Sequence, residues 1–195
     1  MKKIFFTAFI LVLADQVLKF WIKTHMFLGQ EFEIFDWFII HFTENNGMAF
    51  GLEFGGPIGK VLLTLFRIIV VTLGVYYIRS IISVKFRKGA LVASGLILGG
   101  AIGNIIDSTF YGMIFNESYN NVARLFPDSG GYAPFLQGKV VDMFYLPLIN
   151  SHFPSWIPAF GGDHFIFFRP VFNIADAGIS TGIFLILLFY RREFS

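Results

Sequence analysis

The chain has 195 residues, of which 55% are hydrophobic and 14% are charged, with no cysteine and a formal net charge of +2 at pH 7. Soluble domains carry about 25% charged residues, so a water-soluble protein of this composition would expose a large, adhesive apolar surface. The composition therefore excludes an ordinary soluble enzyme. The absence of cysteine excludes disulfides, thiolate metal sites and cysteine nucleophiles.

Four apolar stretches are suited in length to crossing a bilayer, which takes about 20 helical residues. We predict that these spans cover about residues 4–22, 58–78, 91–107 and 171–190. The connections over 23–57 and 108–170 are polar and rich in aromatic residues, glycine and proline. We expect one integral membrane domain over residues 1–195.

Basic residues gather on one side of the predicted spans. Lys2 and Lys3 precede the first span, four basic residues lie between the second and third, and Arg191 and Arg192 follow the fourth. The positive-inside rule then puts both termini in the cytoplasm and both long connections outside it. A cleavable signal sequence is the alternative for the first span, but no small-residue cleavage site precedes Asp15.

Asp15, Lys19 and Arg67 lie well inside the first two spans, where a charge costs about 2.5 to 3.5 kcal/mol near the bilayer centre and needs a partner or a function. Asp15 and Lys19 are four residues apart and share a helix face, so they can form an ion pair. Both a structural and a catalytic role remain open for that pair. Arg67 is expected to neutralise a neighbouring carboxylate or to reach an interface, and not to be catalytic.

The third span carries a stripe of small residues, Gly95, Gly99 and Gly103, at four-residue spacing. Such a stripe lets another helix approach closely. Asn104 and Asp107 continue the stripe to the outer end of the span. We therefore expect polar groups at this membrane edge.

A second polar pair opens the fourth span, where Asn173 and Asp176 are three residues apart on one face. The segment Gly138–Asp142 is β-branched and is expected to form a strand that returns to the membrane surface, where Asp142 can meet Asp176. Two close carboxylates share a proton near neutral pH, as in aspartic proteases, where one activates water and the other polarises the carbonyl. A structural hydrogen-bonded pair and an ion-transport site remain open as alternatives.

Two other patterns are set aside. Gly178–Gly182 matches the Gly-x-Ser-x-Gly nucleophile elbow, but it falls inside a predicted helix, so Ser180 and its small neighbours are better explained by helix packing. The four histidines have no paired-ligand spacing, so we expect no metal and no cofactor. No basic stripe indicates a nucleic-acid partner.

Five segments in chain order carry recognisable motifs: Asp15–Lys19, Glu44–Gly51, Gly99–Asp107, Val140–Asp142 and Phe172–Asp176. They resemble, in the same order, the acid-Gln-x-x-Lys element, the Asn-x-Gly-x-Ala-Phe loop, the Gly-Gly-Ala-x-Gly-Asn-x-x-Asp helix end and the two aspartate-bearing segments of the lipoprotein signal peptidases (signal peptidase II). The five motifs cover most of the chain, and their combination is specific.

The resemblance implies an aspartyl endopeptidase of the bacterial cytoplasmic (inner) membrane, whose active site lies at the extracytoplasmic leaflet. Such an enzyme cuts the signal peptide of a prolipoprotein just before its diacylglyceryl-modified cysteine, so the expected partners are that substrate and membrane lipids; we expect a monomer. Asp142 and Asp176 would be the catalytic dyad. The residues that would line or support the site are Asn45, Gly47, Asn104, Asp107, Asn173, Asp15 and Lys19.

With the resemblance, the expected fold is an all-α membrane protein with four transmembrane helices, a small extracytoplasmic β-sheet cradle and loop or helix insertions. Residues 31–54 would supply the cradle and a mobile helix over the site. The chain departs from the family at Ser108, where the family usually has arginine, and Arg124 or Arg169 is a candidate substitute. Insertions over 113–137 and 146–169 map to the outer face.

Two rival functions remain. In a small proton- or ion-coupled transporter, Asp15, Lys19, Asp107 and Asp176 would form an ion path, although the chain lacks an internal inverted repeat. In a non-catalytic scaffold the same groups would only hold helices together. For the peptidase, we expect Asn45 and the other site asparagines to bind the unwound substrate backbone.

Overall fold

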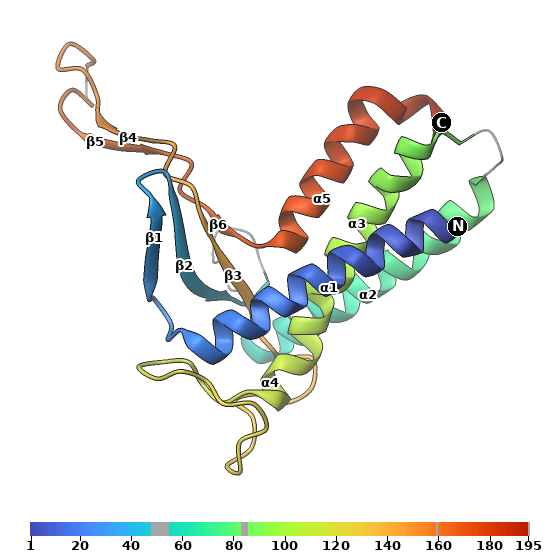
Figure 1. Cartoon of the computed structure of the whole chain (residues 1–195), viewed down its shortest axis with the longest axis horizontal. Coiled ribbons are helices and arrows are strands. Elements are labelled where there is room, and N and C mark those ends of the chain that lie inside the picture. Colours follow the sequence, from blue (N-terminus) through green and yellow to red (C-terminus); the bar gives the residue numbers. More distant parts are fainter. Residues whose placement is uncertain (48–54, 83–85, 159, 195) are drawn as a thin grey trace.

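A computed structural model describes residues 1–47, 55–82, 86–158 and 160–194. Within them, four helical segments are long and apolar enough to cross a membrane. Figure 1 shows these segments side by side, with the start of α1 and the C-terminal end of the chain at the same end of the bundle. The segments are α1 (Lys2–His25), α2 (Gly56–Ile81), α3 (Lys88–Ile106) with its continuation to Ile114, and α5 (Ile174–Leu185) with its continuation to Glu193.

The third helix is longer than the sequence predicted. It continues beyond α3 through the π-helical turn η2 (Asp107–Tyr111) and the short α4 (Gly112–Ile114), where a loop was expected. The expectation was wrong because polar residues after Asp107 indicated the end of the helix. In the structure Ser108 and Tyr111 are buried, so they continue the packed face of the helix.

The fourth helix begins three residues later than predicted, since Val171 and Phe172 form strand β6 (Val171–Phe172). Asn173 is in an extended conformation, and its side chain accepts a hydrogen bond from the backbone N–H of Asp176. This is an N-cap, which supplies a partner for one of the free N–H groups of a first helical turn. The cap places Asp176 in the first turn of α5.

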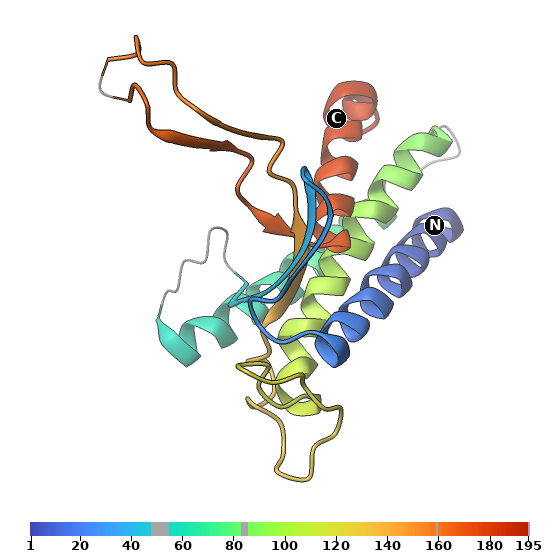
Figure 2. The same cartoon turned by 60° about the vertical axis from the view of Figure 1, so that its left-hand side comes forward.

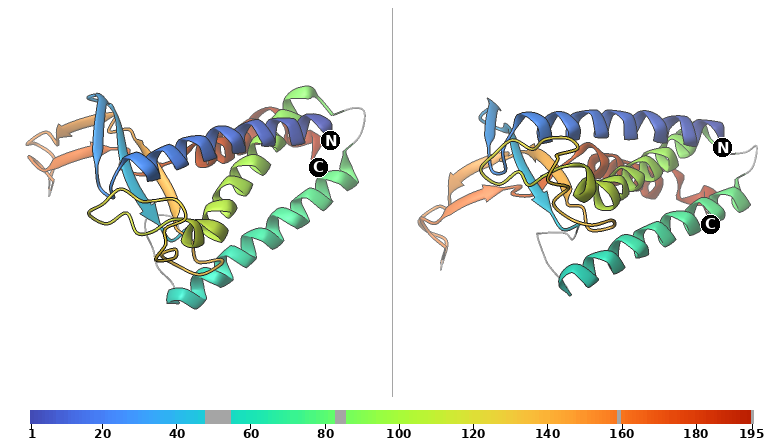
Figure 3. Two further views of the ribbon diagram at one scale, coloured as in Figure 1. Left: turned by 60° about the horizontal axis from the view of Figure 1, so that its bottom comes forward. Right: turned by 90° about the horizontal axis from the view of Figure 1, so that it is seen from below.

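The predicted sheet is present at the other end of the bundle, as Figure 3 shows. Its antiparallel strands lie in the order β1-β2-β3-β6. Residue pairing puts Thr43 opposite Asp142 and Asn45 opposite Val140. The sheet thus brings two site segments together that are far apart in sequence. Its remaining strands are β1 (Glu31–Phe35), β2 (Phe38–Asn45) and β3 (Val140–Tyr145).

The two insertions differ. Residues 113–137 are mainly loop, as expected, with one isolated bridge between Phe115 and Leu125. The second insertion contains a separate two-stranded hairpin, made by β4 (Ile149–His152) and β5 (His164–Phe167). Figure 2 shows this hairpin projecting from the body of the molecule.

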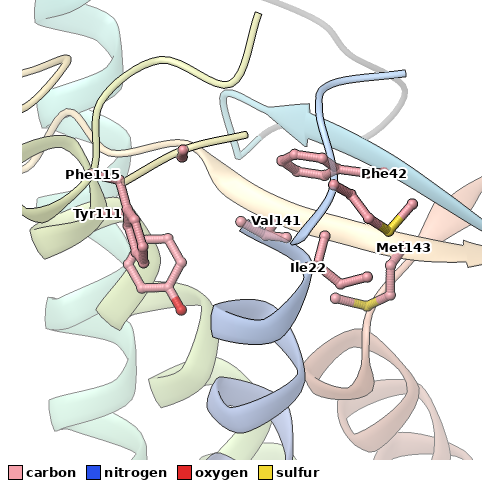
Figure 4. Packing of buried hydrophobic residues seen from close by; sticks show 8 residues of the cluster. Ile22, Phe42, Tyr111, Phe115, Val141 and Met143 are labelled. Carbon is pink, nitrogen blue, oxygen red and sulfur yellow. The ribbon is translucent and has the colours of Figure 1, made fainter. Parts of the chain in front are cut away.

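A buried apolar cluster fastens the sheet to the adjoining ends of the helices (Figure 4). It joins α1 and η2 to β2 and β3, so the strand that carries Asp142 cannot shift relative to the helices without opening this core. Its members are Ile22, Met26, Phe42, Tyr111, Phe115, Ala123, Val141 and Met143.

The predicted close approach along α3 is confirmed. A Cβ on Gly99 would lie 2.8 Å from the carbonyl oxygen of Ala8 on α1, and one on Gly103 would lie 2.7 Å from a carboxylate oxygen of Asp15. Gly182 packs in the same way against the backbone of Ala93, whereas Ser180 is exposed. The small residues around Ser180 therefore serve helix packing.

Candidate active site

Asp142 is placed by strand β3 and is only 3% exposed. Its Oδ1 accepts a hydrogen bond of 2.6 Å from the side-chain amide of Asn173, and its Oδ2 accepts one from the amide of Asn45. Asn45 ends strand β2 and Asn173 caps α5, so three separate segments meet at this carboxyl group. Both oxygens are thereby oriented by amide donors.

Asp176 faces the same site from the first turn of α5 and is half-buried. Its Oδ1 accepts a hydrogen bond of 2.8 Å from the amide of Asn104 on α3. Its Oδ2 receives no hydrogen bond from the described part of the chain. One oxygen is therefore oriented and the other can contact a substrate or water.

Two asparagines link the carboxyl groups to each other. The amide nitrogen of Asn173, which holds Asp142, lies 3.1 Å from Oδ1 of Asn104, which holds Asp176. Burial and the negative charge of Asp176 together raise the pKa of Asp142 to about 8. Coupled carboxyls of this kind can keep a single proton between them near neutral pH.

A buried cluster of charged residues lies next to this site and contacts Asn104, which orients Asp176. The ammonium group of Lys19 is fully buried and lies 2.9 Å from Asp15 Oδ2, 2.7 Å from Asp107 Oδ2 and 3.0 Å from Asn104 Oδ1. The predicted Asp15–Lys19 pair is therefore confirmed. Asp15 also accepts a 2.9 Å hydrogen bond from the backbone N–H of Ala175, which fixes the start of α5 beside Asp176.

Among the described residues, Asp107 does not hydrogen-bond to either carboxyl group directly, but it contacts the strand that carries Asp142. It is fully buried, and its Oδ2 accepts a hydrogen bond of 3.2 Å from the backbone N–H of Val141, next to Asp142. Its other oxygen accepts a 2.8 Å hydrogen bond from Gln16, a residue that was not singled out as part of the site. The acid-Gln-x-x-Lys pattern was the available signal. Asp107 thus steadies the strand, and its carboxyl group is turned toward Lys19.

The turn after Asn45 is also held in place. Gly47 has a φ of +91°, a conformation that favours glycine, and its N–H donates a 2.5 Å hydrogen bond to Asn45 Oδ1. Its carbonyl oxygen accepts a hydrogen bond from the guanidinium of Arg67 on α2. The rest of this motif, residues 48–51, lies outside the described residues.

Arg67 was expected to neutralise a neighbouring carboxylate or to reach an interface, and the structure agrees with the first of these, although the sequence did not indicate its contact with Gly47. Its guanidinium interacts electrostatically with the carboxyl groups of Asp176, Asp142 and Asp107. Two features of the sequence indicated a role for Arg67: it is a charge inside an apolar span, and the family arginine is missing at Ser108. The hydroxyl of Ser108 is buried and donates a 3.0 Å hydrogen bond to the carbonyl oxygen of Asn104.

Neither suggested substitute for the family arginine is found beside Asp107. Its cationic partner is Lys19. Arg124 belongs to the first insertion, where its backbone N–H donates to Asn116, and Arg169 is exposed just before β6. The structure therefore does not support Arg124 or Arg169 as the residue that steadies Asp107, whereas a contact with substrate stays a prediction.

Known proteins match nearly the whole chain. The family model described as signal peptidase (SPase) II matches residues 7–191. A "Lipoprotein signal peptidase" from Porphyromonas gingivalis is 49% identical over 187 residues, which are 95% of this chain and 81% of that protein. One from Amoebophilus asiaticus is 38% identical and covers 98% of this chain and 78% of its own length. A solved "bacterial membrane enzyme" superimposes with a TM-score of 0.61 at 27% identity, covering 96% of this chain and 92% of that one.

Proposed function

Because the chain belongs to the signal peptidase II family, we propose that it is a membrane aspartyl endopeptidase for prolipoproteins. It would cut the signal peptide just before the diacylglyceryl-modified cysteine. The observation that supports the aspartyl chemistry best is the pair Asp142 and Asp176, oriented toward one site by Asn173 and Asn104. Four helices suited to spanning a membrane agree with a multi-pass membrane protease.

The two carboxyls differ in a way that suits a division of labour. Asp142 is buried and holds its proton more tightly, so it donates a hydrogen bond to the oxygen of the scissile carbonyl. Asp176 is more accessible, so it takes a proton from the attacking water. The hydroxide oxygen bonds to the carbonyl carbon, and the proton on Asp176 passes to the leaving amine as the C–N bond breaks.

The asparagines position the dyad in this mechanism. Each of Asn45, Asn104 and Asn173 donates its amide to a catalytic carboxyl, so these groups are occupied before a substrate arrives. This arrangement favours orientation of the dyad over the earlier expectation that the asparagines bind the substrate backbone. Pre-oriented groups need no rearrangement during the reaction.

The membrane fixes where the cut occurs. With both termini cytoplasmic, as the positive-inside rule predicts, the sheet and the dyad face the extracytoplasmic leaflet of the bacterial cytoplasmic membrane. A signal helix must unwind locally before attack, since its backbone carbonyls are hydrogen-bonded within the helix. The diacylglyceryl chains remain in lipid and hold the modified cysteine at one depth, beside Asp176.

The test uses purified protein in lipid nanodiscs and a diacylated prolipoprotein peptide. Wild-type protein should cut before the modified cysteine, whereas Asp142→Asn and Asp176→Asn should be folded and inactive. Ser180→Ala is the matched control on α5 and should retain activity, because Ser180 is exposed and lies one helical turn beyond Asp176. Cleavage by either Asn variant, or ion flux in proteoliposomes without cleavage, would refute the proposal.

A further inference from the structure

The β4–β5 hairpin forms a two-stranded sheet of its own, separate from the four-stranded sheet of the site. It leaves the body between β3 and β6, immediately before α5 begins. An isolated two-stranded hairpin is at best marginally stable in water, because it has no apolar layer to pack against. The hairpin projects from the body of the molecule (Figure 1), so a surface outside the chain could supply that missing layer.

The two faces of the hairpin differ: one is the more apolar and carries the phenylalanines, and the other is the more polar and carries the histidines. Cross-strand pairing sets Ile149 opposite Phe167 and Ser151 opposite Phe165, while His152 pairs with His164. Because neighbouring side chains of a strand point to opposite faces, the phenylalanines share one face and the histidines the other. The apolar side is accessible, since Phe167 is 50% exposed; Trp156, in the connection between the two strands, is 78% exposed.

The charge of this segment is unusually low for a projection. Among residues 146–168, the only Asp, Glu, Lys or Arg is Asp163. A hairpin surrounded by water would present charges, whereas tryptophan and phenylalanine with few charges are typical of the bilayer interface. The composition therefore matches a lipid surface better than bulk solvent.

We propose that the β4–β5 hairpin lies on the outer leaflet as a membrane-interface element, with Trp156, Phe165 and Phe167 among the headgroups. Figures 1 and 2 show it leaving the body sideways, across the direction of the spanning helices. A bilayer that surrounds α5 therefore continues beneath the hairpin. This inference does not depend on the catalytic proposal, since it concerns only the fit between the hairpin and lipid.

The test uses tryptophan fluorescence of the full chain in nanodiscs. Trp21→Phe and Trp37→Phe leave Trp156 as the single tryptophan of the three in the chain. Its emission should be blue-shifted, quenched at least twofold by brominated lipid and protected from iodide in water. The matched control adds Trp156→Phe and His152→Trp, which puts the only indole on the polar face, where iodide should quench it.

Two outcomes would overturn this inference. Trp156 that is open to iodide and unaffected by brominated lipid would mean that the hairpin stands in water. If Trp156 is protected from iodide only after diacylated peptide is added, the hairpin binds the substrate and not the lipid surface.

A second inference, which rests on the proposed function, concerns Arg67. Its guanidinium donates to the carbonyl oxygen of Gly47, and a Cβ on Gly47 would lie 2.8 Å from the guanidinium Nη1. The chain thus packs an arginine from the middle of a membrane span against the turn that follows Asn45. Asn45 in turn donates to Asp142.

The charges around the dyad show why a second cation belongs there. Four carboxyl groups approach the site: Asp15 from α1, Asp107 from η2, Asp142 from β3 and Asp176 from α5. The ammonium of Lys19 makes ion pairs with the first two. Arg67 interacts electrostatically with Asp176, Asp142 and Asp107, and so adds positive charge on the α2 side of the site.

The geometry points to Arg67 as a positioning residue that holds the Gly47 turn, and with it Asn45, against Asp142, while its charge offsets that of the dyad. Removing this positive charge would raise the pKa of the Asp142 carboxyl further. Because the dyad works with one shared proton, its active pH range would then move to higher pH. An arginine with only a structural role would change the rate or the stability, but not that pH range.

The test compares pH–rate profiles of wild type, Arg67→Gln and Arg67→Lys with a diacylated peptide. Arg67→Gln should lower kcat at least tenfold and move the profile upward by about one pH unit. Arg67→Lys should keep the wild-type pH range with a partial loss of kcat, since it keeps the charge without the planar donor fork. Arg79→Gln, in the exposed last turn of α2, is the matched control and should behave as wild type.

The failure of this inference can be told apart from failure of the proposed function. A wild-type protein that does not cleave contradicts the peptidase itself. A cleaving wild type with an unshifted profile in Arg67→Gln overturns only the role of Arg67, even where its rate is reduced.

Discussion

Asn173 holds Asp142 with its side-chain amide at 2.6 Å, while its side-chain oxygen accepts the N–H that opens the helix of Asp176 at 2.8 Å. One residue therefore sets the position of both carboxyls. A change in the cap would move α5 relative to β3, and with it the distance across the dyad.

Asn173→Ala should remove both contacts. Loss of an N-cap costs about 1 kcal/mol, so thermal stability should fall modestly, whereas kcat should fall about a hundredfold because misplaced catalytic groups lose that much rate. Asn173→Ser is the informative control, since it keeps a capping oxygen without the amide. It should recover stability and remain slow; recovery of both would show that the cap alone matters.

The pH dependence of cleavage should follow the coupled carboxyls. Burial and the charge of Asp176 raise the pKa of Asp142 to about 8, so the shared proton is lost as pH rises past that value and kcat/KM should fall there. At acid pH a second proton on the dyad should also lower the rate. A profile that stays flat to pH 10, or one governed by a histidine near pH 6.5, would contradict this assignment.

Much of this arrangement follows from the sequence, because it depends on local patterns. Apolar length predicted the four spans, and a β-branched run predicted the strand of Asp142. The sequence could not reveal that Asn45 would meet Asp142 across two strands, or that Arg67 would contact Gly47. Both contacts depend on how distant segments pack, and periodicity within one segment carries no such information.

The buried Lys19 should be essential to folding as well as to activity. Lys19→Met leaves the carboxyls of Asp15 and Asp107 without their cation, and breaking a buried pair in this way costs about 3 to 5 kcal/mol. The melting temperature in detergent should fall steeply. Lys2→Gln, in the exposed first turn of the same helix, should leave the melting temperature nearly unchanged; equal effects would contradict the role of the cluster.

The close contact between α1 and α3 should be intolerant of a single methyl group. Gly99→Ala would place a Cβ 2.8 Å from the backbone oxygen of Ala8, so the helices must separate and Asn104, one turn further on, must shift. Both stability and cleavage should decrease. Gly74→Ala is the control on α2, where a Cβ meets nothing within 4 Å; it should be neutral or stabilising by up to about 1 kcal/mol.

A second buried ion pair joins the first insertion to the site. The ammonium of Lys23 is fully buried and lies 2.5 Å from Glu44 and 2.8 Å from the hydroxyl of Ser118 in the insertion. The aromatic rings of Phe42, Phe115 and Tyr132 surround it at 5.1 to 5.9 Å. Because Glu44 immediately precedes Asn45, this pair ties the insertion to a residue that orients Asp142.

Glu44→Gln should therefore act on both the insertion and the rate. It leaves Lys23 without its buried counter-charge, so residues 113–137 should become sensitive to limited proteolysis and kcat should fall roughly tenfold as Asn45 loosens. Glu117→Gln is the matched control. Glu117 is 52% exposed and pairs with Lys139 at 3.2 Å, and exposed pairs contribute about 0 to 1 kcal/mol. A Glu44→Gln protein with wild-type turnover and proteolytic resistance would show that the insertion is independent of the dyad.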